Sequence, residues 1–113
     1  MKRFSAVMVF VMFAGGAAFA QDAKVEAGKA AYTTYKCATC HQIKGTGGKL
    51  ASALDGVATK LSAADIKKWL IDPAAMEAKL PTKPKMLMST NLKTKKITPA
   101  EFEALEAYLA TLK

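Results

Sequence analysis

The stretch Cys37-Ala38-Thr39-Cys40-His41 decides how the rest of this chain is organised. Its spacing, C-x-x-C-H, is typical of a site where haem is attached covalently. Two thiols separated by two residues can add to the two vinyl groups of one porphyrin from a single helical turn. The adjacent histidine then lies beneath the ring, where an imidazole nitrogen can bind iron. The motif therefore predicts thioether bonds from Cys37 and Cys40 and an axial bond from His41.

Other uses of paired cysteines fit this chain less well. Structural zinc sites take four nitrogen or sulfur ligands, and the sequence has two cysteines and one histidine. A thioredoxin-like redox pair is expected within a βαβ unit, and the sequence shows no convincing strand pattern. A disulfide across two intervening residues would close a very short loop and gain little entropic stabilisation. Haem attachment is therefore the interpretation that the motif favours.

The first twenty residues have the pattern of a secretory signal peptide. A positively charged start is followed by an apolar run over residues 6–13 and then by a small-x-small cleavage site, Ala18-Phe19-Ala20. A membrane anchor is the alternative, but the apolar run is short for a membrane span. We therefore expect residues 1–20 to be removed by cleavage after Ala20. The remaining residues, 21–113, are enough for one domain.

The segment before the pentapeptide predicts a helix. Residues 22–36 are rich in alanine, lysine and glutamate, which are good helix formers. Gly28, Tyr32 and Tyr35 fall on one face of this helix because they are spaced four and three residues apart. That face predicts either ordinary core packing or a close approach of a second helix at Gly28, with Tyr32 packed into it.

Three further helices are predicted after the pentapeptide. An N-cap with an acidic third position begins a helix over 62–72, a short helix follows over 73–79, and a capping box with proline at the first helical position begins one over 98–112. The stretches 42–56 and 79–97 predict loops, because glycines punctuate the first and the second has two prolines and no helical period. The pattern as a whole predicts an all-α domain. A domain of this size has a thin core by itself, so a buried haem would supply much of it.

These features resemble the class I cytochromes c. The resemblance rests on the pentapeptide, on the stretch from Gly28 to Tyr32, on residues 66–73 and on the last helix. It implies the cytochrome c fold, with about four helices wrapped around one covalently bound haem c. It also implies that the first and last helices cross, with Gly28 and Tyr32 against Leu105 and Tyr108.

The resemblance also implies roles for residues around the haem. Trp69 stands where the family has an aromatic side chain lining the haem pocket, although a core tryptophan without such a role is the alternative. In the family, a proline carbonyl accepts a hydrogen bond from the second ring nitrogen of the ligating histidine. Ser52 stands where that proline is expected. The sequence therefore leaves the acceptor for His41 open, and any nearby backbone carbonyl could serve.

The second axial ligand of the iron cannot be another histidine of this chain, because His41 is the only one. Methionine, lysine, water or an outside group remain. A lysine amine must first lose a proton, whereas methionine sulfur binds directly and raises the reduction potential. Met76 lies in the short helix and is better explained as filling a gap in the core. The resemblance favours Met86 as the ligand, with Met88 as the alternative.

A haem with both axial positions filled has no open coordination site for a substrate. The resemblance therefore implies a periplasmic one-electron carrier, which is not an enzyme and has no small-molecule substrate. We expect it to be a monomer. One alternative is a haem c module docked permanently in a larger redox enzyme. Another is a peroxidase or gas sensor with an open sixth site, but such sites generally need polar distal groups, and residues 21–113 contain no arginine and no second histidine.

Lysine makes the exported chain basic. The full sequence has a formal net charge of +8, which falls to +6 when Lys2 and Arg3 leave with the signal peptide. Lysines flank both the pentapeptide and the candidate methionines: Lys36, Lys44, Lys83, Lys85, Lys93, Lys95 and Lys96. Such a patch would steer the protein towards acidic docking surfaces of a membrane oxidase, reductase or dehydrogenase. A solvated face that only keeps the protein soluble is the alternative, and nucleic acid is not an expected partner outside the cytoplasm.

Overall fold

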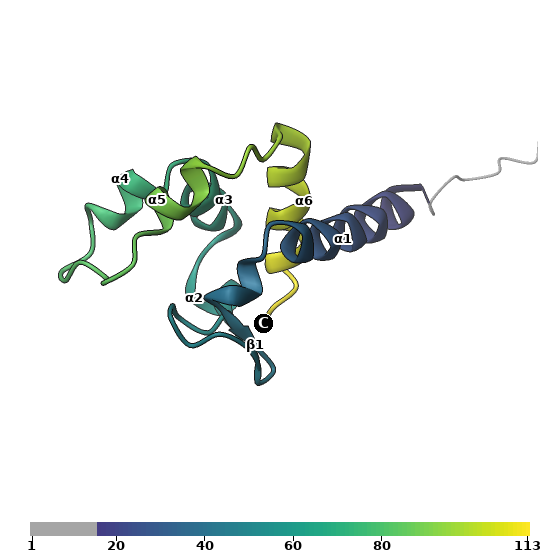
Figure 1. Cartoon of the computed structure of the whole chain (residues 1–113). Helices are drawn as coiled ribbons and strands as arrows, with labels where there is room; N and C mark the ends of the chain where they lie inside the picture. The colour runs from purple at the N-terminus through teal and green to yellow at the C-terminus, as the bar shows by residue number, and fades with distance from the viewer. Residues whose placement is uncertain (1–15) are drawn as a thin grey trace, which may run out of the picture.

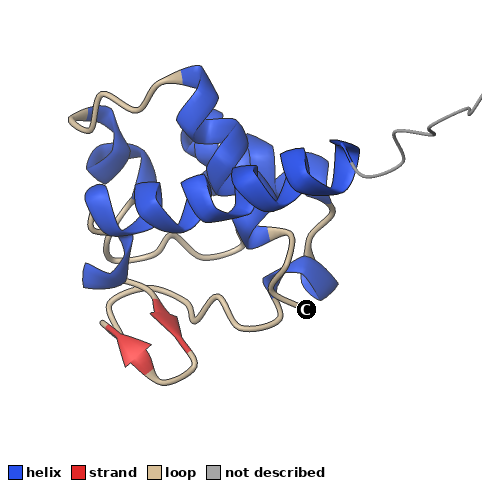
Figure 2. Ribbon diagram, turned by 90° about the vertical axis from the view of Figure 1, so that its right-hand side faces the viewer, coloured by secondary structure: helices blue, strands red, loops and turns tan. Residues whose placement is uncertain are grey.

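The computed structural model describes residues 16–113. In chain order the elements are α1 (Gly16–Thr34), the 3-10 turn η1 (Cys37–Thr39), β1 (Gln42–Ile43), β2 (Thr46–Gly47), α2 (Val57–Lys60), α3 (Ala63–Ile71), α4 (Pro73–Glu77), α5 (Met88–Lys93) and α6 (Pro99–Leu109). Helices α1 and α6 cross, and α3, α4 and α5 form a second group on the other side of α6 (Figure 1). The only strands in this part of the chain are two residues long and form the small hairpin shown in Figure 2.

The predicted signal peptide lies largely outside the described residues. Its first fifteen residues are not described, and its last five begin α1. Cleavage after Ala20 therefore stays a prediction. Within residues 16–113, no helix has both the length and the apolar character needed to span a membrane.

The crossing of α1 and α6 depends on Gly28. A Cβ added there would lie 2.6 Å from Tyr108 Cβ and 2.8 Å from the carbonyl carbon of Ala104, which is closer than carbon atoms can approach. The rings of Tyr32 and Tyr108 meet edge to face, with centroids 5.8 Å apart. Leu105 is only 1% exposed and belongs to the same core cluster as Tyr32. The predicted helix crossing is therefore confirmed, with Ala104 as an additional contact of Gly28.

The hydrophobic core joins three helices. Its buried members come from α1, α3 and α6: Ala31, Tyr32, Ile66, Leu70, Leu105 and Leu109. Helix α3 begins where the sequence predicts, because Ser62 Oγ accepts the N–H of Asp65 at 3.2 Å. Helix α6 begins with the predicted capping box between Thr98 and Glu101. The chain end returns to the rest of the fold through Ala58 N–H, which donates to Leu112 O at 2.9 Å.

Both loop predictions are wrong in part. Within the loop predicted over 42–56, Gln42–Ile43 pair with Thr46–Gly47 as β1 and β2. The sequence also predicts an extended loop over 79–97, but Met88–Lys93 form α5. Its N-cap residue, Leu87, provides no side-chain cap. Instead, the carboxylate of Glu77 accepts the N–H of Ser89 at 2.8 Å. Because that acceptor lies twelve residues earlier in the chain, no local sequence signal announces the helix.

Candidate haem site

The pentapeptide forms a tight turn directly after α1. Lys36 has left-handed backbone angles, φ 55° and ψ 39°, which change the chain direction before η1. The N–H groups of Cys40 and His41 both donate to Cys37 O, at 3.2 and 3.0 Å. Both cysteines are half-buried, and neither forms a disulfide. The two thiols that the motif predicts to bond one porphyrin therefore belong to the same short turn.

The β1–β2 hairpin packs its backbone against this turn. Gly48 N–H donates to Ala38 O at 2.7 Å. A Cβ on Gly48 would lie 2.8 Å from the carbonyl carbon of Thr39, and Gly47 has φ +120°, which favours glycine. The sequence identifies these glycines only as loop residues. The structure shows that they allow the hairpin to approach the attachment turn.

His41 is oriented by a backbone carbonyl. Its Nδ1 lies 2.7 Å from Ser52 O. Because a carbonyl oxygen can only accept, Nδ1 carries the proton, and Nε2 keeps the lone pair that a metal requires. Ala51 N–H in turn donates to Cys40 O at 2.8 Å, which holds this stretch beside the turn. The acceptor that the sequence leaves open is therefore the carbonyl of Ser52, at the position where the family has proline.

The surroundings of the Cys37 thiol raise its pKa. Burial is the largest effect and raises the pKa of Cys37, while the nearby Lys95 ammonium acts in the opposite direction. Lys95 reaches this region because its Nζ donates to Tyr35 O at 2.6 Å. Redox-active cysteines instead have lowered pKa values. The direction of the shift therefore disfavours a thioredoxin-like reactive pair.

A buried polar atom next to this turn has no partner. Tyr32 Oη makes no hydrogen bond with any described residue. Burial is the main reason that its pKa is raised to about 12, and the neighbouring Cys37 contributes in the same direction. Buried polar groups in folded proteins are nearly always paired. An unpaired hydroxyl beside the attachment turn thus fits a site that a further group completes.

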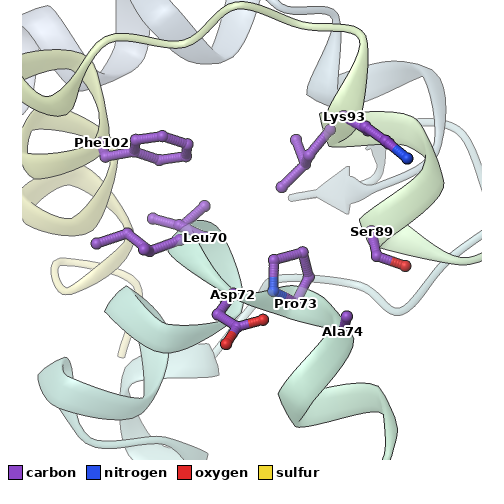
Figure 3. A pocket seen from close by; sticks show the side chains of 9 residues that line it. Leu70, Asp72, Pro73, Ala74, Ser89, Lys93 and Phe102 are labelled. Atoms are coloured by element: carbon purple, nitrogen blue, oxygen red, sulfur yellow. The ribbon is translucent and has the colours of Figure 1, made fainter.

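The donor set of residues 16–113 fits a porphyrin-held metal better than a metal held by side chains alone. No three histidine, cysteine, aspartate or glutamate residues gather there in a way that could hold an ion. A haem needs only the two thiols and one imidazole nitrogen from this part of the chain. The cavity of about 290 Å³ in Figure 3 lies elsewhere, between α3, α4, α5 and α6, and none of the pentapeptide residues lines it.

The remaining candidate residues differ in their packing. Trp69 is half-buried on α3, on which Ile66 and Leu70 form the buried face. Met86 precedes α5 and is 44% exposed. Met88 begins α5 and packs against the core cluster. The roles of Trp69, Met86 and Met88 at the haem stay predictions.

Sequence reasoning missed Glu77. This residue ends α4 and is the buried charged residue of the described core, at 7% exposure. Its Oε1 accepts Ser89 N–H at 2.8 Å, and its Oε2 accepts Ser89 Oγ–H at 2.7 Å. The only available signal is an acidic residue in a short, mostly apolar helix, and that pattern alone does not predict burial.

Comparison with known proteins gives one finding that extends over most of the chain. The family model described as Cytochrome c matches residues 25–113. No curated protein and no solved structure matches this sequence. The matched span contains the attachment turn, Ser52, both candidate methionines and α6.

Proposed function

This chain belongs to the cytochrome c family, and on that premise we propose that it is a one-electron carrier of the periplasm. Membership of the family means that it carries covalent haem c with iron and takes part in haem-based electron transfer. The expected all-α cytochrome c fold and the expected cofactor are thereby confirmed. The haem supplies an iron that accepts and releases one electron. The protein determines the ligands of that iron, its access to solvent and its partners.

The hydrogen bond from His41 Nδ1–H to Ser52 O carries this proposal. It points to His41 as the proximal ligand, because the bond leaves Nε2 unprotonated while the two thiols lie on the same turn. A ring held in this way moves little when the charge of the iron changes. Small movement of the ligands favours fast electron exchange, which is what a carrier requires.

We propose methionine as the second axial ligand. Met86 is the first candidate because of its place in the family resemblance, and Met88 is the alternative because it already packs against the core. A thioether favours ferrous iron and raises the reduction potential. With both axial positions filled, no coordination site remains for a substrate. The protein is therefore proposed to be a carrier and not an enzyme.

Optical spectra of the purified protein test this ligation. Ferric haem bound to methionine sulfur has a weak charge-transfer band in the red. We expect the band in the wild type and in Met88→Ala, and its loss in Met86→Ala. Loss in Met88→Ala alone would transfer the assignment to Met88. A wild type without the band, whose ferrous form binds carbon monoxide rapidly, would contradict the carrier proposal and favour an open site.

The proposed partners are redox proteins with acidic docking surfaces, such as a membrane oxidase, reductase or dehydrogenase. Six of the seven lysines that flank the site are exposed: Lys36, Lys44, Lys83, Lys85, Lys93 and Lys96. Lys95 is partly buried by its bond to Tyr35 O. If the exposed lysines steer docking, the rate of electron transfer falls steeply as ionic strength rises. A monomer in gel filtration of native extracts supports a free carrier over a docked module.

A further inference from the structure

Electron transfer by itself does not explain the burial of Glu77. A carboxylate removed from water costs free energy unless it is paired or hydrogen-bonded. Here both carboxylate oxygens are used, one by the backbone N–H and one by the hydroxyl of Ser89. Charge-assisted hydrogen bonds of this kind are stronger than neutral ones. Glu77 is therefore a specific connection between the end of α4 and the start of α5.

This connection closes a loop that contains both candidate methionines. Residues 78–88 lie between Glu77 and Ser89, and residues 78–86 are exposed to solvent. The backbone bonds of the loop lie at its two ends, where Leu80 N–H donates to Glu77 O and Leu87 O accepts Asn91 N–H. Beyond Leu87, α4 and α5 are in contact. The two bonds to Ser89 form the neck of this loop.

Glu77 also replaces the cap that α5 lacks. The first N–H groups of a helix have no partner within it, and Leu87 provides no side-chain acceptor. The Glu77 carboxylate accepts one of these groups and places negative charge at the positive end of the helix. Helix α5 has six residues, too few to be stable without tertiary contacts. Loss of the carboxylate would therefore loosen the turn that begins with Met88 and follows Met86.

We propose that Glu77 is a positioning residue for the methionine ligand of the haem, because it fixes the neck of the 78–88 loop. This inference rests on the methionine ligation of the proposed function. Residues 78–86 of this loop are exposed, so the packing of its own side chains does little to hold a methionine in place. With the neck closed, the sulfur resists displacement by an added ligand such as imidazole. With the neck open, a lower concentration of imidazole displaces it.

The test is a titration of the ferric holoprotein with imidazole at constant pH, followed by the sulfur-to-iron charge-transfer band. We expect Glu77→Ala to lose the band at about a tenfold lower imidazole concentration than the wild type, which is a tenfold weaker preference for sulfur. Ser89→Ala shifts the midpoint in the same direction by less, because its backbone N–H still donates. Glu77→Gln keeps an acceptor for that N–H but removes the charge, so its midpoint should lie between those of the wild type and Glu77→Ala. The control Glu103→Gln removes an exposed carboxylate and leaves the midpoint unchanged.

Thermal unfolding of the same proteins separates positioning from simple stabilisation. A Glu77→Ala protein that unfolds at a lower temperature but keeps the wild-type midpoint would overturn the inference, and methionine ligation would stand. A wild type without the band would overturn both. If Glu77→Ala fails to accumulate with haem, Ser89→Ala decides, because an unchanged midpoint in that variant contradicts the role of the neck.

Discussion

The segments proposed to supply the histidine ligand and the methionine ligand, here called the histidine side and the methionine side, are held by different kinds of contact. On the histidine side, backbone atoms converge on the attachment turn, and the imidazole itself bonds to Ser52 O. On the methionine side, Met86 is exposed, and the start of α5 depends on one side chain, Glu77. Backbone contacts survive most substitutions, whereas a side-chain contact is lost with a single one. We therefore expect the proposed methionine side to yield first to mutation.

The largest loss of stability is expected at Gly48, where the backbone of the attachment turn leaves no room for a side chain. Gly48→Ala places a Cβ against the Thr39 backbone, so it should lower the free energy of unfolding of the holoprotein by about 3 kcal/mol, at the upper end for overpacking. Gly45→Ala is the matched control, because nothing lies within 4 Å of its added Cβ and only its φ of +77° is unfavourable. That strain costs about 1 kcal/mol. Equal losses in denaturant titrations would contradict the close approach of the hairpin.

A smaller, pH-dependent loss of stability is expected where the residue after α1, Tyr35, contacts the start of α6. Tyr35 Oη–H donates to Glu101 Oε1 at 2.7 Å, and this bond, followed by those from Thr98, lowers the pKa of Glu101 from its ordinary 4.5. A carboxylate with a lowered pKa stabilises the fold above its ordinary pKa. This contribution is lost as the pH falls from 4.5 through the folded value.

Tyr35→Phe measures that contribution. Its free energy of unfolding should be lower than that of the wild type at pH 7, and the difference should shrink below pH 4.5. The variant leaves the capping box of Thr98 and Glu101 in place, so helix content is unchanged. A difference that stays constant from pH 7 to pH 3 would show that the bond to Glu101 does not act through the ionised carboxylate.

The smallest change in stability and in the haem spectrum is expected on substitution of Ser52. Its carbonyl oxygen makes the contact with His41, and its side chain is exposed. Ser52→Pro keeps that carbonyl and restores the residue type that the family resemblance leads one to expect. We predict an unchanged haem spectrum and an unfolding free energy within about 0.5 kcal/mol of the wild type. A shifted spectrum would mean that the serine itself, rather than its backbone oxygen, tunes the histidine.

The two sides also differ in how far the sequence predicts them. The attachment turn, the N-cap at Ser62, the capping box at Thr98 and the helix crossing at Gly28 all follow from short-range patterns, and the structure contains each of them. The residues that predict each cap lie within four positions of it, and the helix crossing at Gly28 matches a pattern of the family.

Two features that the sequence does not predict are made by residues distant in sequence. Helix α5 is capped by Glu77 from twelve residues away, and the acceptor for His41 is eleven residues from it. The choice between Met86 and Met88 stays open for a related reason. Met86 lies just before α5, and Met88 is its first residue. The direction in which each side chain points depends on how the 78–88 loop closes, and the spacing of apolar residues does not predict that closure.

The most direct test of the whole account is peptide mapping by mass spectrometry of protein purified with its native export. The account predicts a peptide containing both Cys37 and Cys40 that carries the added mass of one haem, with neither thiol open to alkylation. The same peptide recovered without that mass, with both thiols alkylated, would contradict it.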